Sequence, residues 1–204
     1  MPNSQVVHVI DDDVGVRQSL AFLLSTAGLA VRVHESAVAF LAALPSAQDG
    51  CIVTDVRMPG MDGLELQRRL REKKIGLPVI VMTGHGDVAL AVEAMKAGAA
   101  DFIEKPFDDE ILLSAIRAAL ARHAQSAESE GRRTAIRARL GQLSEREREV
   151  LDGLVAGKPN KIIAYDLGIS ARTVEVYRAN VMTKMQADSL SELVRMVLLS
   201  GGIK

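Results

Sequence analysis

Short apolar runs alternate with stretches of helical periodicity through the first 123 residues of the chain. The runs are rich in Val and Ile and predict β-strands over residues 6–10, 31–33, 51–54, 79–82 and 102–104. Between them, apolar side chains recur three or four positions apart and predict helices over 14–27, 36–44, 63–74, 87–97 and 108–123. Strands that are continuously apolar, each followed by a helix, indicate a buried parallel sheet with helices on both faces.

The pattern changes after residue 123. Residues 125–131 are small and polar, as linkers are, and 132–140 can extend as helix because Ile136 and Leu140 lie four positions apart. Beyond Leu143 only helices are predicted, and they begin at Ser144, Asn160, Ser170 and Ser189. The sequence therefore predicts an α/β domain over 4–122, a polar and partly helical linker over 123–139, and an all-α domain over 140–204.

Composition narrows the classes of function. With 3% aromatic residues and no Trp, base stacking on aromatic platforms is an unlikely mode of nucleic-acid binding, and the single Cys51 excludes a disulfide framework or a multi-cysteine zinc site. Residues 1–123 carry a net charge of −4 and residues 124–204 one of +3, so nucleic acid is a candidate partner for the second part. No apolar run approaches the length of a membrane span, and we expect a soluble cytoplasmic protein.

Polar residues follow four of the five predicted strands. Three acids, Asp11, Asp12 and Asp13, end the first strand, and Asp55 follows the third. Thr83 ends the fourth strand and Lys105 the fifth. The carboxyl ends of parallel strands meet at one edge of a sheet, where ligands bind at the topological switch point. We therefore expect these side chains to converge there, except Asp13, which is interpreted as a helix N-cap or a solvated acid.

Carboxylates held close together repel one another unless a divalent cation joins them, and all-oxygen ligands suit Mg²⁺. With the metal and Lys105 neutralising charge, a carboxylate can act as a nucleophile towards a phosphoryl group. Thr83 can then donate a hydrogen bond to the phosphoryl oxygens. A tight turn at Lys105–Pro106, a bond type that can be cis, is suited to aim the lysine inward.

These segments together resemble the receiver domain of two-component response regulators. The motifs are Val9-Ile10-Asp11-Asp12, the stretch from Asp55 to Gly63, Thr83-Gly84 and Lys105-Pro106-Phe107. The resemblance implies that Asp55 accepts a phosphoryl group from a histidine kinase. It implies Mg²⁺ or Mn²⁺ held by Asp12, Asp55 and the backbone carbonyl of Arg57, with Asp11 assisting through water.

The same resemblance makes Thr83 and Phe102 a switch pair, in which the threonine moves towards the phosphoryl group and the ring rotates to follow. Phe102 also fits a core position of the fifth strand, and the two interpretations are compatible. His85 and the Arg57 side chain occupy positions that tune hydrolysis of the acyl phosphate in this family, or are solvated loop residues.

Residues 160–185 predict a helix-turn-helix: a short helix, a turn at Gly168-Ile169-Ser170, and a longer helix whose apolar face carries Val174, Val181 and Met185. In this motif the second helix enters the major groove. Cationic candidates for phosphate contacts are Lys161, Arg172, Arg178 and Lys184. Neutral hydrogen-bonding candidates are Asn160, Thr173 and Tyr177. Candidate base contacts are Glu175 to cytosine and Val176 and Ala179 to a thymine methyl.

The segment from Leu143 to Leu151 and the motif Leu167-Gly168-Ile169-Ser170 resemble the LuxR-type DNA-binding domain. Glu175 and Tyr177 depart from the family, which usually has Lys or Arg and His at these positions. A receiver followed by this domain is the layout of the NarL/FixJ subfamily. Resemblance to its nitrogen-fixation regulators implies a FixL-type oxygen-sensing kinase, RNA polymerase and double-stranded DNA as partners, and a homodimer after phosphorylation.

Two other functions are weighed against this one. A phosphatase with an aspartyl nucleophile usually has a second acid close after it, where this chain has Arg57. A protein-binding adaptor would show absent or salt-independent DNA binding. The sequence also leaves open whether the unphosphorylated receiver masks the DNA-binding domain or simply fails to dimerise.

Overall fold

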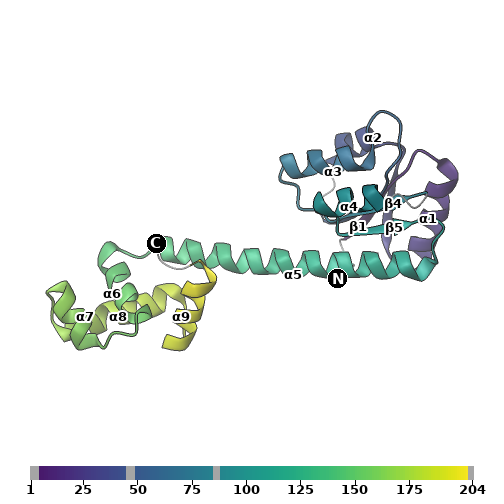
Figure 1. The fold of residues 1–204 in the computed structure, drawn as a ribbon. Helices are drawn as coiled ribbons and strands as arrows, with labels where there is room; N and C mark the ends of the chain where they lie inside the picture. Colours follow the sequence, from purple (N-terminus) through teal and green to yellow (C-terminus); the bar gives the residue numbers. More distant parts are fainter. Residues whose placement is uncertain (1–4, 45–48, 85–87, 202–204) are drawn as a thin grey trace. The chain divides into compact units, whose positions relative to one another are not determined.

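The computed structural model describes residues 5–44, 49–84 and 88–201 (Figure 1). The predicted N-cap Asp87 and the candidate His85 lie outside the described residues. The chain divides into two units, and the division falls after Gln125.

The first unit is built on five parallel strands in the order β2-β1-β3-β4-β5. The strands are β1 (Val6–Ile10), β2 (Ala30–His34), β3 (Gly50–Asp55), β4 (Val79–Thr83) and β5 (Asp101–Glu104). From β1 the chain first forms β2 on one side, and it then crosses over β1 to form β3 on the other side. The topological switch point therefore lies between the carboxyl ends of β1 and β3. The doubly wound parallel sheet predicted from the sequence is confirmed.

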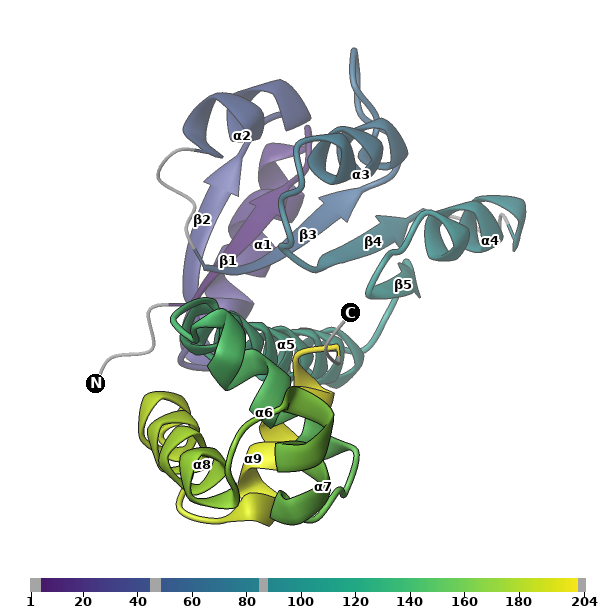
Figure 2. The same ribbon diagram turned by 90° about the vertical axis from the view of Figure 1, so that its left-hand side faces the viewer.

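Helices cover both faces of this sheet (Figures 1 and 2). They are α1 (Val14–Thr26), α2 (Ala37–Ala43), α3 (Gly63–Glu72), α4 (Val88–Lys96) and α5 (Asp109–Gly141). One core cluster joins β1, β3 and β4 to α1 and α5, and another joins the opposite face to α2, α3 and α4. The alternation of Val7 and Val9 with His8 and Ile10 places the side chains of β1 in both layers.

Strand β2 differs from the prediction that the strands are buried. It is an edge strand, paired only with β1, and Ala30, Arg32 and Val33 are exposed. An edge strand lacks a neighbour on one side, so its side chains lose contacts that central strands make. The apolar character of Val31 and Val33 could not distinguish the edge from the centre.

The predicted polar linker is helical throughout, because α5 runs without a break from Asp109 to Gly141. The linker over 123–139 was predicted to be partly helical, and the structure shows helix over its whole length. Ala, Glu, Gln and Arg are strong helix formers, and Glu128 and Arg132 form an i, i+4 ion pair at 2.6 Å. Small polar composition is therefore compatible with an exposed helix here. No helix in the described ranges is both long enough and apolar enough to cross a membrane.

The second unit contains α6 (Glu145–Val155), α7 (Asn160–Leu167), α8 (Ala171–Met185) and α9 (Leu190–Leu199) (Figure 2). Ser144 caps α6 in a reciprocal capping box with Glu147, and Ser170 and Ser189 cap α8 and α9. The four helices surround one apolar core that includes Val150, Ile163, Val174 and Val197. The four helices were correctly predicted, and three of them follow directly on the serines at which they were expected to begin.

The buried His8 of β1 and the half-buried His34 of β2 lie side by side. His8 Nδ1 and His34 Nε2 are 3.1 Å apart, and both rings pack against the edge of Phe40. Burial, with the charges of His34 and Arg32, lowers the pKa of His8 to about 4, and burial together with the charge of Arg32 also lowers the pKa of His34. Both rings are therefore neutral in the folded protein at neutral pH.

This pair predicts a loss of stability in mild acid. Below the ordinary histidine pKa of about 6.5 the unfolded chain binds protons that the folded chain does not, so the free energy of unfolding falls until the pH reaches the folded pKa. For His8 alone the expected fall between pH 7 and pH 5 is about 2 kcal/mol. Urea unfolding at several pH values measures it. His8→Leu should make the dependence of the free energy of unfolding on pH shallower, and a dependence equal to that of wild type would contradict the prediction.

Candidate functional site

Two acids meet at the switch point of the sheet. Asp11 directly follows β1 and Asp55 ends β3, and the register pairs Ile10 with Thr54, so the two acids continue adjacent strands. Both are buried, with 2% of Asp11 and 9% of Asp55 exposed. The strand order, rather than closeness in sequence, brings these carboxylates together.

Lys105 joins the two acids. Its Nζ atom lies 2.8 Å from Asp55 Oδ1 and 3.1 Å from Asp11 Oδ2. Burial alone would lower the pKa of Lys105, but the hydrogen bonds and charges of Asp55 and Asp11 raise it above its ordinary value. The lysine is therefore charged, and it balances one of the two carboxylates. The Lys105–Pro106 peptide bond is cis.

Backbone amides fix the orientation of both carboxylates. The N–H of Arg57 donates to Asp55 Oδ2 at 2.7 Å, and the N–H of Asp13 donates to Asp11 Oδ1 at 2.9 Å. The Asp13 side chain accepts from the first turn of α1, which confirms its N-cap role. Arg17, one turn further on, donates to the carbonyl of Asp11 at 2.7 Å. Arg17 was not among the residues predicted for this site, although its place on the first turn after the acids was a usable signal.

Asp12 differs from its neighbours because its side chain is exposed. Within the described residues, no hydrogen bond or ion pair holds its carboxylate. In the same part of the chain, no three His, Cys, Asp or Glu side chains converge closely enough to hold a metal by themselves. Mg²⁺ commonly uses one or two carboxylates with several waters, so this donor set fits it if a backbone carbonyl completes the site.

Gly63, the first residue of α3, lies directly against the phosphoacceptor candidate. A Cβ atom on Gly63 would stand 2.4 Å from the carbonyl oxygen of Asp55, and the Gly63 N–H donates to the carbonyl of Val56 at 3.0 Å. Only glycine therefore allows the start of α3 to approach the end of β3 this closely. From the sequence, Gly63 was predicted only as the start of a helix at the end of the Asp55–Gly63 motif.

Thr83 and Phe102 lie on neighbouring strands. Thr83 ends β4 and is buried, and Phe102 lies in β5, half-buried against the cluster formed with α3 and α4. The register pairs Val81 with Phe102, and the N–H of Lys105 donates to the Thr83 carbonyl at 2.7 Å. The fold thus holds Thr83 beside Lys105, while Phe102 occupies the core position that the sequence allowed.

The second site is the helix-turn-helix formed by α7 and α8. Gly168 ends α7 in the left-handed conformation with φ 64°, which permits the tight turn into α8. Val174, Val181 and Met185 are fully buried, as predicted, so the opposite face of α8 is left to solvent.

The predicted DNA-contacting residues fall into two groups by burial. The exposed residues are Lys161, Arg172, Glu175, Val176 and Ala179. The half-buried residues are Asn160, Thr173, Tyr177, Arg178 and Lys184. The first group lies on the side of α8, and at the start of α7, that a partner can reach.

Lys184 has a contact inside the domain. Its Nζ atom lies 2.6 Å from Glu147 Oε2, and only 5% of the Glu147 side chain is exposed. The hydrogen bond from Lys184, followed by that from the N–H of Ser144, lowers the pKa of Glu147. The Lys184 ammonium therefore ties α8 to the capping box of α6. A contact of Lys184 with phosphate stays a prediction and would compete with this ion pair.

Family models match two regions of the chain. Residues 7–117 match the response regulator receiver domain, and residues 141–197 match the bacterial regulatory proteins of the luxR family. The first match covers the sheet and its acids, and the second covers the helix-turn-helix.

Relatives match almost the whole chain. The transcriptional regulatory protein FixJ of Azorhizobium caulinodans is 63% identical over 201 residues, covering 98% of this chain and 95% of that protein. The response regulator protein TmoT of Ectopseudomonas mendocina is 44% identical, covering 93% and 86%. The crystal structure of full-length FixJ from B. japonicum is 53% identical, with a TM-score of 0.63 over 99% of this chain and 100% of that one. The response regulator StyR is 40% identical, with a TM-score of 0.86 over 96% and 99%.

Receiver domains generally bind Mg²⁺ at the phosphorylation site, and LuxR-type domains bind DNA, so both sites described above have a family counterpart. The chain belongs to the two-component response regulators, as a FixJ-like transcriptional regulator with a receiver domain and a LuxR-type DNA-binding domain.

Proposed function

We propose that a histidine kinase phosphorylates Asp55, and that the phosphorylated chain dimerises and activates transcription from promoters of nitrogen-fixation genes. The observation that supports this best is the buried Asp55 carboxylate, 2.8 Å from Lys105 and beside Asp11 at the switch point of the sheet. The resemblance to FixJ supports a FixL-type oxygen sensor as the kinase and RNA polymerase as a further partner.

Asp55 acts as the nucleophile. One of its carboxylate oxygens attacks phosphorus, the P–N bond of the phosphohistidine breaks, and the histidine nitrogen keeps the electron pair and takes a proton. Lys105 and the N–H of Arg57, which already contact the two oxygens of Asp55, hold the carboxylate in place. Thr83 then donates to the phosphoryl group. The chain accepts this group and hydrolyses it slowly, without acting as a turnover enzyme.

Mg²⁺ or Mn²⁺ would be held by Asp12, Asp55 and the backbone carbonyl of Arg57, with Asp11 bound through water. When bound, the cation neutralises charge that develops on the phosphoryl oxygens. The exposed Asp12 carboxylate, which has no partner among the described residues, supports this assignment. Lys105 balances only part of the negative charge of Asp11, Asp12 and Asp55, so a cation would balance more of it.

The phosphoryl group biases a two-state equilibrium in the face formed by α4 and β5. Thr83 moves towards the phosphoryl group, and Phe102, which lacks a hydroxyl, transmits the change by its shape alone. The altered α4–β5 faces of two receiver domains bind each other. The resulting homodimer places its two helix-turn-helix units on the two halves of an inverted repeat in the DNA. The unphosphorylated receiver either masks the DNA-binding domain or simply fails to dimerise.

Helix α8 is the element that enters the major groove of double-stranded DNA. Lys161, Arg172 and Arg178 neutralise phosphates, and Asn160, Thr173 and Tyr177 add neutral hydrogen bonds. Glu175 accepts from a cytosine amino group, while Val176 and Ala179 contact a thymine methyl. The exposure of Arg172, Glu175 and Val176 supports this assignment.

The test uses the full chain with a small-molecule phosphodonor. With donor and Mg²⁺, we expect a phosphorylated species in the intact mass, a dimer in sedimentation, and tighter promoter binding that weakens steeply with salt. Donor with a chelator instead of Mg²⁺ is the control. Phosphorylation that leaves DNA affinity unchanged would contradict the proposal.

A second experiment tests whether the unphosphorylated receiver masks the DNA-binding domain. It compares the DNA affinity of the isolated C-terminal unit with that of the unphosphorylated full chain, and equal affinities exclude masking.

A further inference from the structure

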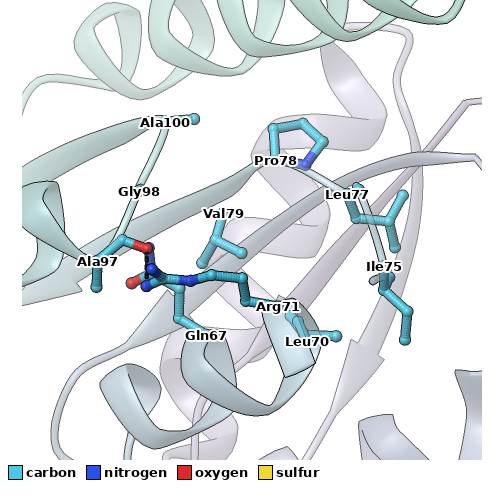
Figure 3. A pocket seen from close by; sticks show the side chains of 11 residues that line it. Gln67, Leu70, Arg71, Ile75, Leu77, Pro78, Val79, Ala97, Gly98 and Ala100 are labelled. Carbon is cyan, nitrogen blue, oxygen red and sulfur yellow. Dashed lines mark hydrogen bonds between the residues drawn. The ribbon is translucent and has the colours of Figure 1, made fainter. Parts of the chain in front are cut away.

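The C-terminal ends of α3 and α4 lie on two sides of a pocket of about 330 Å³ (Figure 3). Pro78 and Val79, at the start of β4, line it, so the pocket lies at the edge of the sheet opposite to Asp55. Leu70, Ile75 and other apolar side chains form most of its wall. Ala94 packs in the core cluster with α3, but the pocket leaves the chain beyond Ala94 without close packing against the end of α3.

Two side chains of α3 reach across to the end of α4. Gln67 Nε2 donates to the carbonyl of Ala94 at 3.3 Å, and Arg71, one turn later, donates through Nη2 to the carbonyl of Ala97. Figure 3 shows Gln67, Arg71 and Ala97 together at one end of the pocket. The Ala94 carbonyl also accepts from the N–H of Ala99 at 3.0 Å. For the Ala97 carbonyl, Arg71 is the one donor among the described residues.

Gln67 is incompletely satisfied in this arrangement. The residue is 4% exposed, and its Oε1 atom is buried without a hydrogen-bond partner in the described part of the chain. A buried amide oxygen without a partner raises the free energy of the arrangement that contains it. This cost offsets part of the stabilisation from the Gln67–Ala94 hydrogen bond. We therefore assign to Arg71 the larger share in holding the end of α4 in place.

The opposite end of α3 is fixed at the phosphoacceptor, where Gly63 lies against the carbonyl of Asp55. Helix α3 therefore has one end against Asp55 and holds the end of α4 near its other end. We propose that Arg71, assisted by Gln67, is a positioning residue that keeps α4 in its unphosphorylated place, so that switching breaks the Arg71–Ala97 bond. This inference rests on the proposed function, in which Asp55 is the phosphoacceptor and α4 is part of the dimerising face.

A bond shifts the equilibrium only by the amount to which it differs between the two states. The net contribution of a typical hydrogen bond corresponds to about a fivefold change in an equilibrium constant. Loss of the Arg71 bond should therefore raise the population of the dimerising state about fivefold in the absence of phosphate, and change little once phosphorylation has already populated that state.

The test compares full-length variants by sedimentation. Arg71→Met keeps an unbranched apolar side chain and removes its donors. Without phosphodonor we expect its dimer to be about 25-fold tighter than that of wild type, because both protomers gain the fivefold factor. Fully phosphorylated, the two proteins should dimerise equally. Arg71→Lys keeps a donor and should behave like wild type. Arg68→Met removes the same charge from the same helix, but Arg68 pairs with Glu65 within α3, so no shift is expected.

A purely structural role of Arg71 predicts the opposite sign, because a loosened domain dimerises more weakly. Unphosphorylated Arg71→Met that dimerises equally to or more weakly than wild type would therefore overturn the inference. A second measurement does not depend on dimerisation. Beryllium fluoride with Mg²⁺ serves as a phosphoryl analogue, and calorimetry should show about fivefold tighter binding to Arg71→Met, because one protomer binds one analogue and coupling is reciprocal.

The two proposals fail in different ways. If wild type binds beryllium fluoride but does not dimerise with phosphodonor, the proposed output is wrong, and the calorimetric comparison still decides about Arg71. If wild type and Arg71→Met bind beryllium fluoride equally, the role of Arg71 is wrong while phosphorylation of Asp55 stands. Beryllium fluoride binding that survives Asp55→Asn would overturn both.

Discussion

Asp55→Asn is expected to abolish phosphorylation and the increase in DNA affinity that follows it. The amide is a poor nucleophile, and the 2.8 Å ion pair with Lys105 loses its negative partner. With phosphodonor and Mg²⁺, the intact mass should stay unchanged and promoter affinity should equal that of untreated wild type. The lost gain is expected to be about 5- to 150-fold, the usual range of coupling between two sites.

Asp13→Asn is the matched control for this change. Asp13 lies at the same edge of the sheet and carries the same charge, but its side chain caps α1 instead of contacting Lys105. Asn is as good an N-cap as Asp, so the fold should be retained. Phosphorylation of Asp13→Asn should proceed as in wild type. Peptide mapping of phosphorylated wild type that located the phosphoryl group on an acid other than Asp55 would show that Asp55 is not the phosphoacceptor.

Gly63→Ala is expected to lower the free energy of unfolding by about 1–3 kcal/mol and to slow phosphorylation of Asp55. The added methyl group would stand 2.4 Å from the Asp55 carbonyl oxygen, which is backbone and cannot rotate away. Either α3 or the end of β3 has to shift, and a shift of β3 moves the nucleophile relative to Lys105. Urea unfolding and the rate of phosphorylation by a small phosphodonor measure the two effects.

Gly131→Ala is the control with the opposite sign. Gly131 lies within α5, and its added Cβ would meet nothing within 4 Å. Alanine should therefore stabilise the helix by about 0.5–1 kcal/mol and leave phosphorylation unchanged. If Gly63→Ala matched wild type in both measurements, the close approach of α3 to Asp55 would not constrain the site.

The fold class and the centre of the first site could be predicted from the amino-acid pattern alone. Apolar runs separated by helical stretches specify parallel strands, and parallel strands present their carboxyl ends at one edge. Asp11, Asp55 and Lys105 could therefore be placed together although they are far apart in the chain, and the structure confirms it. The helix-turn-helix was equally accessible, because Gly168 and Ser170 act within one or two turns of their own positions.

Contacts that depend on how separate elements approach one another could not be predicted from the sequence and became visible in the folded chain. The exposure of β2 follows from its place at the edge of the sheet, and the approach of Gly63 to Asp55 follows from the packing of α3. Lys184 was predicted to contact phosphate, and the sequence did not indicate its ion pair with Glu147 of another helix, 2.6 Å away. Periodicity and capping are local properties that state which face of an element is apolar. They contain no distances between elements, and these distances position Lys184 against Glu147 and Gly63 against Asp55.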